Sequence, residues 1–183
     1  MLIVILVIIA VLVVIAIGIY NTLVVKRNRV KNGWSQIDVQ LKRRIDLIPN
    51  LVETVKGYAA HEKAIFERIA EARSLAINAK GPAESASANN QLNDTLKTLF
   101  AVVENYPNLK ANENFRDLQA QLEGTENRIA VARKRYIDAV MGYNKAVRFF
   151  PTNLTAKYIL HLELRETFQP EGQPIERPPE VKF

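Results

Sequence analysis

The side chains that most often perform chemistry are scarce in this chain, and their spacing matches no common catalytic or metal-binding motif. The only histidines are His61 and His161. A di-iron helical bundle needs Glu-x-x-His on two helices, but the residues three positions earlier are Tyr58 and Tyr158. Neither histidine starts a His-Glu-x-x-His zinc motif. We therefore expect no metal site and no cofactor.

Nucleophiles and acid–base pairs are equally weak signals. Cysteine is absent, which excludes disulfides, thiolate zinc sites and a cysteine nucleophile. No glycine-rich phosphate loop occurs, and the serines lie in no nucleophile-elbow sequence. Glu53 with Glu62, or Glu104 with Glu113, could be posed as catalytic carboxylate pairs, but solvated surface charges explain them better. We expect a protein that is not an enzyme.

Positive charge is the clearest chemical feature. Residues 26–44 contain seven Lys or Arg against one acid, Asp38, and they account for the whole formal net charge of +6. Beside a bilayer such a cluster attracts anionic headgroups, by about 1 kcal/mol per well-placed residue. The charges elsewhere balance, so no basic face is left for a nucleic acid. The candidate headgroup contacts are Lys26, Arg27, Arg29, Lys31, Lys42 and Arg43.

The cluster follows a segment that is suited to a membrane. Residues 1–25 carry no charged side chain, and as a helix they span about 37 Å, against about 30 Å for a hydrocarbon core. A cleaved signal peptide would need a basic start and a small-x-small cleavage site, so we favour an uncleaved anchor. Positive charge near a membrane-spanning end is retained in the cytoplasm. We expect a single-pass cell-membrane protein with its N-terminus outside and residues 26–183 in the cytoplasm.

The elements that position these residues are helices. Between residues 34 and 76, eleven of thirteen positions with heptad spacing are apolar, which predicts a long helix packed along one seam. Because the heptad phase survives Pro49, we expect one bent, continuous helix from residue 26 to residue 78. The two exceptions are Arg44 and Glu62. Each either lies in a locally hydrated seam or pairs with a charge on another helix or protomer and so fixes register.

Further helices follow breaks at Gly81-Pro82 and at Tyr106-Pro107. We expect a second helix over about 88–106 and a third over about 112–150, with Asn112 as its N-cap. A short helix over about 152–163 follows Pro151, and the proline-rich tail should be extended or disordered. The predicted fold is all-α, a single transmembrane helix followed by an elongated antiparallel bundle of three long helices and a short fourth. The expected domains are residues 1–25, an anchor; residues 26–168, a cytoplasmic bundle; and residues 169–183, the tail.

Several segments are also similar to those of a known family. Residues 34–44 and 46–52 resemble the signature block of the LemA family, residues 104–112 its second block, and residues 125–130 its third. The resemblance covers residues 18–165. It implies a bacterial-type, single-pass membrane protein with a helical soluble domain and no established enzymatic activity. One branch of the family is associated with building organelle membranes in magnetic bacteria.

These observations favour a non-enzymatic, membrane-anchored helical scaffold that self-associates at the cytoplasmic face and organises or shapes the membrane. The alternative is a monomeric adaptor that recruits an unidentified partner protein, such as a membrane protease or transporter, through the tail. A sensory stalk is a weaker third reading. Contact with a lipid headgroup or a second protomer is expected at residues 34–44, although Trp34 and its apolar neighbours also fit an ordinary core. The candidate oligomer or register contacts are Trp34, Arg44 and Glu62.

Overall fold

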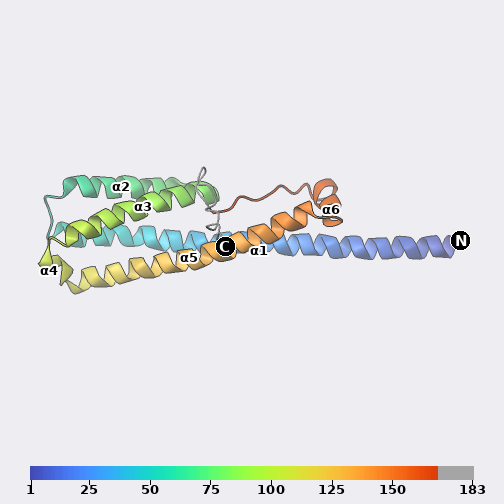
Figure 1. Cartoon of the computed structure of the whole chain (residues 1–183), viewed down its shortest axis with the longest axis horizontal. Helices are drawn as coiled ribbons and strands as arrows, with labels where there is room; N and C mark the ends of the chain where they lie inside the picture. Colours follow the sequence, from blue (N-terminus) through green and yellow to red (C-terminus); the bar gives the residue numbers. More distant parts are fainter. Residues whose placement is uncertain (169–183) are drawn as a thin grey trace, which may run out of the picture. The chain divides into compact units, whose positions relative to one another are not determined.

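A computed structural model describes residues 1–168, and the tail prediction lies outside the described residues. No strand occurs in the described part, so the predicted all-α class is confirmed there (Figure 1). By their contacts the residues form two compact units. Unit 1 contains Met1–Leu47 and Arg116–Thr167, and unit 2 contains Ile48–Phe115 together with Phe168. The helices are α1 (Leu2–Lys56), α2 (Lys63–Asn78), α3 (Gly81–Val103), α4 (Pro107–Lys110), α5 (Glu113–Arg148) and α6 (Thr152–Tyr158).

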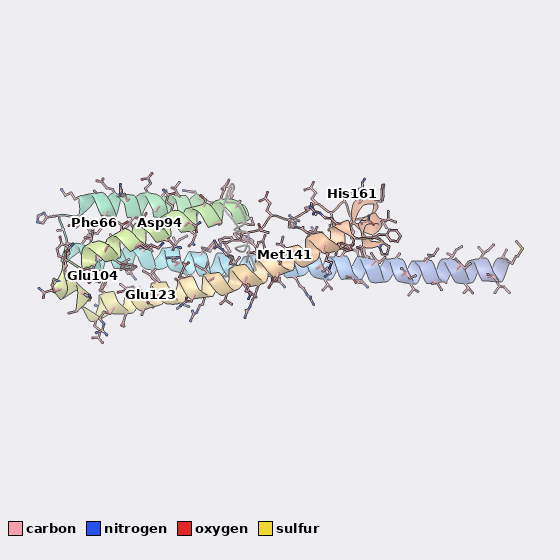
Figure 2. All side chains as sticks on the ribbon, viewed as in Figure 1. Phe66, Asp94, Glu104, Glu123, Met141 and His161 are labelled. Carbon is pink, nitrogen blue, oxygen red and sulfur yellow. The ribbon has the colours of Figure 1, made fainter. Side chains whose placement is uncertain are left out.

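Helix α1 contains the charge-free segment and runs on without interruption through Pro49, as predicted. Its first part is long and apolar enough to cross a membrane by length and composition. Residues 1–18 are exposed throughout, with their side chains projecting freely (Figure 2), and α1 is first covered at Ile19. An exposed apolar helix of this length is typical of a membrane-associated protein.

The expected continuity to residue 78 is wrong, because α1 ends at Lys56 and α2 begins at Lys63. Gly57 follows the last helical residue, and glycine costs about 1 kcal/mol in a helix interior. Turn hydrogen bonds from Tyr58 to Val55 and from Glu62 to Ala59 hold the connection. The break escaped the heptad pattern because Ile65 and Ile69 on α2 return to the same phase and are buried.

Helices α2 and α3 pack side by side in unit 2 and are joined by only two residues, Ala79 and Lys80 (Figure 1). So short a connection makes them antiparallel. Helix α3 begins at Gly81, not near residue 88 as expected. Pro82 fits the first helical turn, where its missing N–H needs no partner. The Lys80 N–H donates to the Glu84 carboxylate at 2.7 Å and holds the start of the helix.

The remaining helices follow the predictions more closely. Asn112 is the N-cap of α5 as expected, because its Oδ1 accepts a hydrogen bond from the Phe115 N–H at 3.0 Å. Helix α3 ends at Val103, and α4 is a single turn before that cap. Helix α5 closely matches the predicted third helix. Helix α6 begins at Thr152 as expected but is shorter than predicted, since it ends at Tyr158.

Candidate interaction surfaces of the α1–α5 pair

Within unit 1, α1 and α5 lie side by side and run in opposite directions. A Cβ placed on Gly142 would lie 3.9 Å from Nζ of Lys26, and one placed on Gly33 would lie 3.4 Å from Cα of Tyr136. Further along α1, Arg44 pairs with Glu126. Residue numbers therefore rise along α1 while they fall along α5. This register positions every candidate residue on the pair.

The two helices are in close contact at Gly33 and Trp34. Gly33 is buried, and a Cβ there would already touch the backbone and ring of Tyr136, so a side chain larger than alanine would press on them. The rings of Trp34 and Tyr136 are tilted at 58° with centroids 6.0 Å apart, a favourable aromatic geometry. Trp34 is therefore a partly covered packing residue within the chain. Gly33 was not predicted from the sequence as a packing position. A glycine next to an aromatic residue inside a helical pattern could have indicated it.

Arg44 is the polar residue held most firmly in the seam. It is only 5% exposed, and its Nη1 donates to Oε2 of Glu126. Burial lowers the pKa of the Arg44 guanidinium below its ordinary value, and the Glu126 carboxylate opposes that shift. Arginine nevertheless stays protonated in proteins. Of the two sequence interpretations, the structure favours pairing with another helix, in this case a helix of the same chain.

Glu126 is a second residue that sequence reasoning did not single out. Its carboxylate also acts on Arg133, one of the arginines interpreted from the sequence as a solvated face. Burial lowers the pKa of the Arg133 guanidinium, and Glu126 again opposes the shift. The Glu126 carboxylate thus interacts electrostatically with Arg44 on α1 and with Arg133 on α5. Glu126 lies in the polar segment that resembles the third LemA block, but heptad spacing alone does not show which acid faces Arg44.

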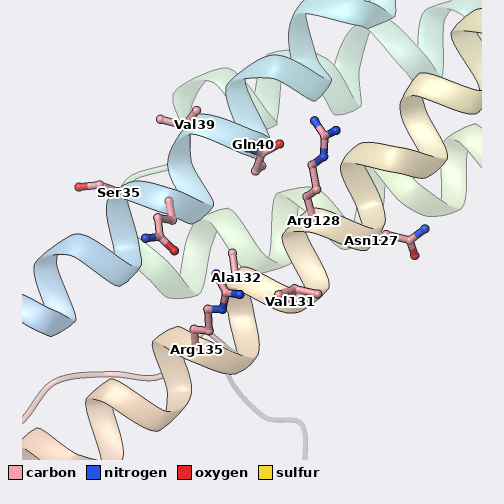
Figure 3. Close-up of a pocket in the computed structure, with 9 residues that line it drawn as sticks. Ser35, Val39, Gln40, Asn127, Arg128, Val131, Ala132 and Arg135 are labelled. Carbon is pink, nitrogen blue, oxygen red and sulfur yellow. The ribbon is translucent and has the colours of Figure 1, made fainter.

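A shallow groove opens beside the Arg44 pair, between α1 and α5 (Figure 3). Its volume is about 610 Å³. Val39 on α1 and Val131 on α5 are more than half exposed, so each side of the groove presents an apolar side chain to solvent. Polar side chains surround them. The lining residues are Ser35, Gln36, Val39, Gln40, Asn127, Arg128, Val131, Ala132 and Arg135.

The predicted headgroup contacts lie on α1 before and beside this groove. Lys26 is partly covered where it meets α5. Lys42 forms an exposed ion pair with Asp38 one turn away, at 2.7 Å. The other four are exposed: Arg27, Arg29, Lys31 and Arg43.

Glu62, the last predicted register residue, belongs to unit 2. Its carboxylate accepts a hydrogen bond from the Tyr106 hydroxyl at 3.0 Å, so it too has a partner within the chain. This hydrogen bond raises the pKa of the Tyr106 phenol above its ordinary value, with smaller contributions from burial and charge. The hydroxyl of Tyr58 accepts a second cross-element hydrogen bond, from Asn112 at 3.1 Å. The residues that bracket the α1–α2 connection are therefore tied to the segment that precedes α5.

Sequence similarity connects the chain with a known family and with several named proteins. The model of the LemA family matches residues 33–183. The chain is similar to Magnetosome protein MamQ 2 and MamQ 1 of Paramagnetospirillum magneticum, each 28% identical over 176 residues and 82% of this chain. It is also similar to Protein LemA of Metamycoplasma hominis, 24% identical over 145 residues and 77% of this chain.

The chain spans 64% of each of these MamQ proteins and 65% of that LemA protein, slightly less than two thirds of their length. Because the family model covers most of the sequence, the comparison establishes the family. The chain belongs to the LemA family.

Proposed function

We propose that the protein is a non-enzymatic, membrane-anchored scaffold that self-associates through the groove between α1 and α5 and thereby organises or shapes the membrane. The observation that carries the proposal is the exposure of Val39 and Val131 on the two sides of that groove. Apolar side chains that are exposed on the two sides of an open groove lose contact with water when a partner enters.

A second copy of the chain suits the groove better than an unrelated partner. Copies that are anchored by α1 in one membrane carry the groove at the same distance from the bilayer. Their grooves therefore encounter one another by diffusion in the plane of the membrane. A two-fold contact would use the same patch on both copies, with the valines at the centre. Arg128, Arg135 and Gln36 would form the polar rim around them.

The basic residues supply the second part of the proposal, contact with anionic lipid. The charge-free segment of α1 is followed at once by Lys26 and Arg27, and the exposed cations continue to Arg43. Positive charge at this position favours a cytoplasmic location for residues 26–183 and an outer N-terminus. Relatives that carry the name magnetosome protein support a role at a membrane-bounded structure.

Single-cysteine cross-linking tests self-association, because the natural chain has no cysteine to remove. Val39→Cys and Val131→Cys chains, alone and mixed, are treated with a bismaleimide in native membranes. Ala130→Cys is the matched control, since residue 130 is exposed on the same helix but turned by about 100° from Val131. We expect dimers from the valine positions and few from Ala130.

Equal cross-linking at Val131 and Ala130 would indicate random collisions and contradict a groove interface. No cross-linking at either position would contradict self-association and favour the adaptor alternative, in which a single chain recruits another protein. The same cysteines report orientation. A membrane-impermeant maleimide added to intact cells should leave Ala130→Cys unlabelled and label it after the cells are opened.

A further inference from the structure

An exposed apolar hairpin at the end of α5 has no role in the proposed scaffold contact. Phe150 is 78% exposed and Tyr158 is 67% exposed, although large aromatic residues normally lie inside. Helix α6 itself has an inner face, because Thr155 and Ala156 are buried. Its other face and the preceding turn therefore present a concentrated apolar surface in the described part of the chain. The residues of this surface are Phe149, Phe150, Leu154, Tyr158 and Ile159.

Hydrogen bonds close the hairpin at its base. The Tyr143 hydroxyl donates to the Glu163 carbonyl at 2.9 Å. The Asn144 side chain donates to the Arg165 carbonyl and accepts from the Arg165 N–H, both at 2.9 Å. Residues 145–162 thus form a defined projection beyond this base, with His161 near its return (Figure 2).

The register of α5 on α1 places the hairpin beside the charge-free segment. Gly142 meets Lys26, the first charged residue of α1. Because α5 runs toward the start of α1, the end of α5 lies about level with Asn21. The coverage of α1 agrees, since Ile19 is its first partly covered residue and Leu23 its first buried one. The hairpin therefore lies alongside residues that precede the first charge.

These levels correspond to the boundary between headgroups and hydrocarbon. The charge-free segment is about 37 Å long and a hydrocarbon core is about 30 Å thick, so about 7 Å of the segment lies in the interface. Segments that bind in this interface place apolar and aromatic side chains about 5–10 Å into the bilayer surface. Phe and Tyr at the tip of the hairpin match that requirement.

The hairpin carries positive charge and no negative charge, which suits contact with anionic lipid. Residues 139–162 contain no acid and three cations, Lys145, Arg148 and Lys157. Two of these lie over aromatic rings of the same surface, Lys145 at 5.2 Å from the centroid of Phe149 and Lys157 at 5.5 Å from that of Tyr158. Cations at the edge of an inserted apolar surface remain at headgroup level.

We propose that the α5–α6 hairpin is a second membrane contact, which inserts Phe149, Phe150 and the outer face of α6 into the same leaflet interface that α1 leaves. The proposal rests on α1 as the anchor but not on self-association. Two attachment points along α5 and α1 fix the rotation of unit 1 about α1. Such a contact gives the anchored domain a defined face toward the membrane.

Fluorescence of a labelled hairpin tests the proposal in the full chain, reconstituted at one chain per nanodisc with anionic lipid. The label NBD is attached to Phe150→Cys, a position exposed enough to accept it. Ala130→Cys carries the same label as the control. We expect blue-shifted emission at residue 150 and loss of that emission with nitroxide-bearing lipids, while residue 130 emits as in water.

Emission at residue 150 that matches residue 130 would overturn the proposal. Emission that shifts only when two chains share a nanodisc would overturn it as well, because another copy would then cover the hairpin. A second variant checks the mechanism. Phe149→Ser in the labelled chain should reduce quenching at residue 150, whereas Val131→Ser should leave it unchanged, so failure of the groove contact and failure of the hairpin contact are distinguishable.

Discussion

Removal of Glu126 should destabilise the chain more than removal of its buried partner Arg44. In the folded chain Arg44 is 5% exposed, whereas the Glu126 side chain is 43% exposed. Glu126→Ala leaves the guanidinium in the seam without this carboxylate. Arg44→Met instead removes the buried charge, keeps most of the volume, and leaves a carboxylate that water can reach.

The magnitude follows from that asymmetry. Loss of one partner from a fully buried pair costs about 3–5 kcal/mol. Because water reaches Glu126, we expect Glu126→Ala to lower the free energy of unfolding by about 2–3 kcal/mol. Arg44→Met should lower it by less than about 1 kcal/mol, since apolar replacement of a buried ion is often neutral. Asp38→Ala, which breaks the exposed pair with Lys42, should cost about 0.5 kcal/mol or less.

The assay is urea unfolding of the full chain in nanodiscs, followed by the fluorescence of the only tryptophan, Trp34, which packs on Tyr136. With a slope of about 2 kcal/mol per M, Glu126→Ala should lower the urea midpoint by about 1–1.5 M. If Glu126→Ala behaves like Asp38→Ala, or if Arg44→Met is the more damaging change, the assignment of Arg44 as a buried, paired cation is refuted.

Two further predictions use the same chain. Gly33→Leu should lower the free energy of unfolding by about 1–3 kcal/mol through overpacking, because a Cβ there already lies 3.4 Å from Tyr136. Gly33→Ala should be tolerated. Equal urea midpoints for the two variants would show that the helices do not meet closely at this point. The raised pKa of Tyr106 means that the folded chain holds the phenol proton more tightly than the unfolded chain. Its contribution to stability is present below about pH 10 and is lost as the pH rises through the raised pKa. Tyr106→Phe should therefore reduce the loss of helical circular dichroism under alkaline titration, and an unchanged titration would contradict this role.

Sequence periodicity predicted the helices because most buried positions are apolar and recur with heptad spacing. Leu41, Ile48 and Leu51 are among the apolar residues with that spacing, and all three are buried. Arg44 was recognised as a seam residue for the same reason. Its partner could not be predicted, because pairing with Glu126 depends on the register of α5 across 82 residues of sequence.

The errors lie where local signals are weak. Gly57 follows the last residue of α1, but the apolar phase resumes after it and hides the turn. Gly81-Pro82 was interpreted as a break before a helix that starts near residue 88, whereas the left-handed φ of 76° at Gly81 lets the chain reverse and start α3 at once. The exposed face of α6 was not predicted, because the apolar side chains of a short helix fit a buried core equally well.

Size and shape of the full-length protein, extracted with its native lipid, test self-association most directly. Light scattering and negative-stain imaging of that material measure the number of chains in each particle. We predict a large, defined assembly whose formation is weakened by a charge at Val131. A single 20.7 kDa protomer in its lipid patch would contradict the scaffold and leave the adaptor as the better explanation.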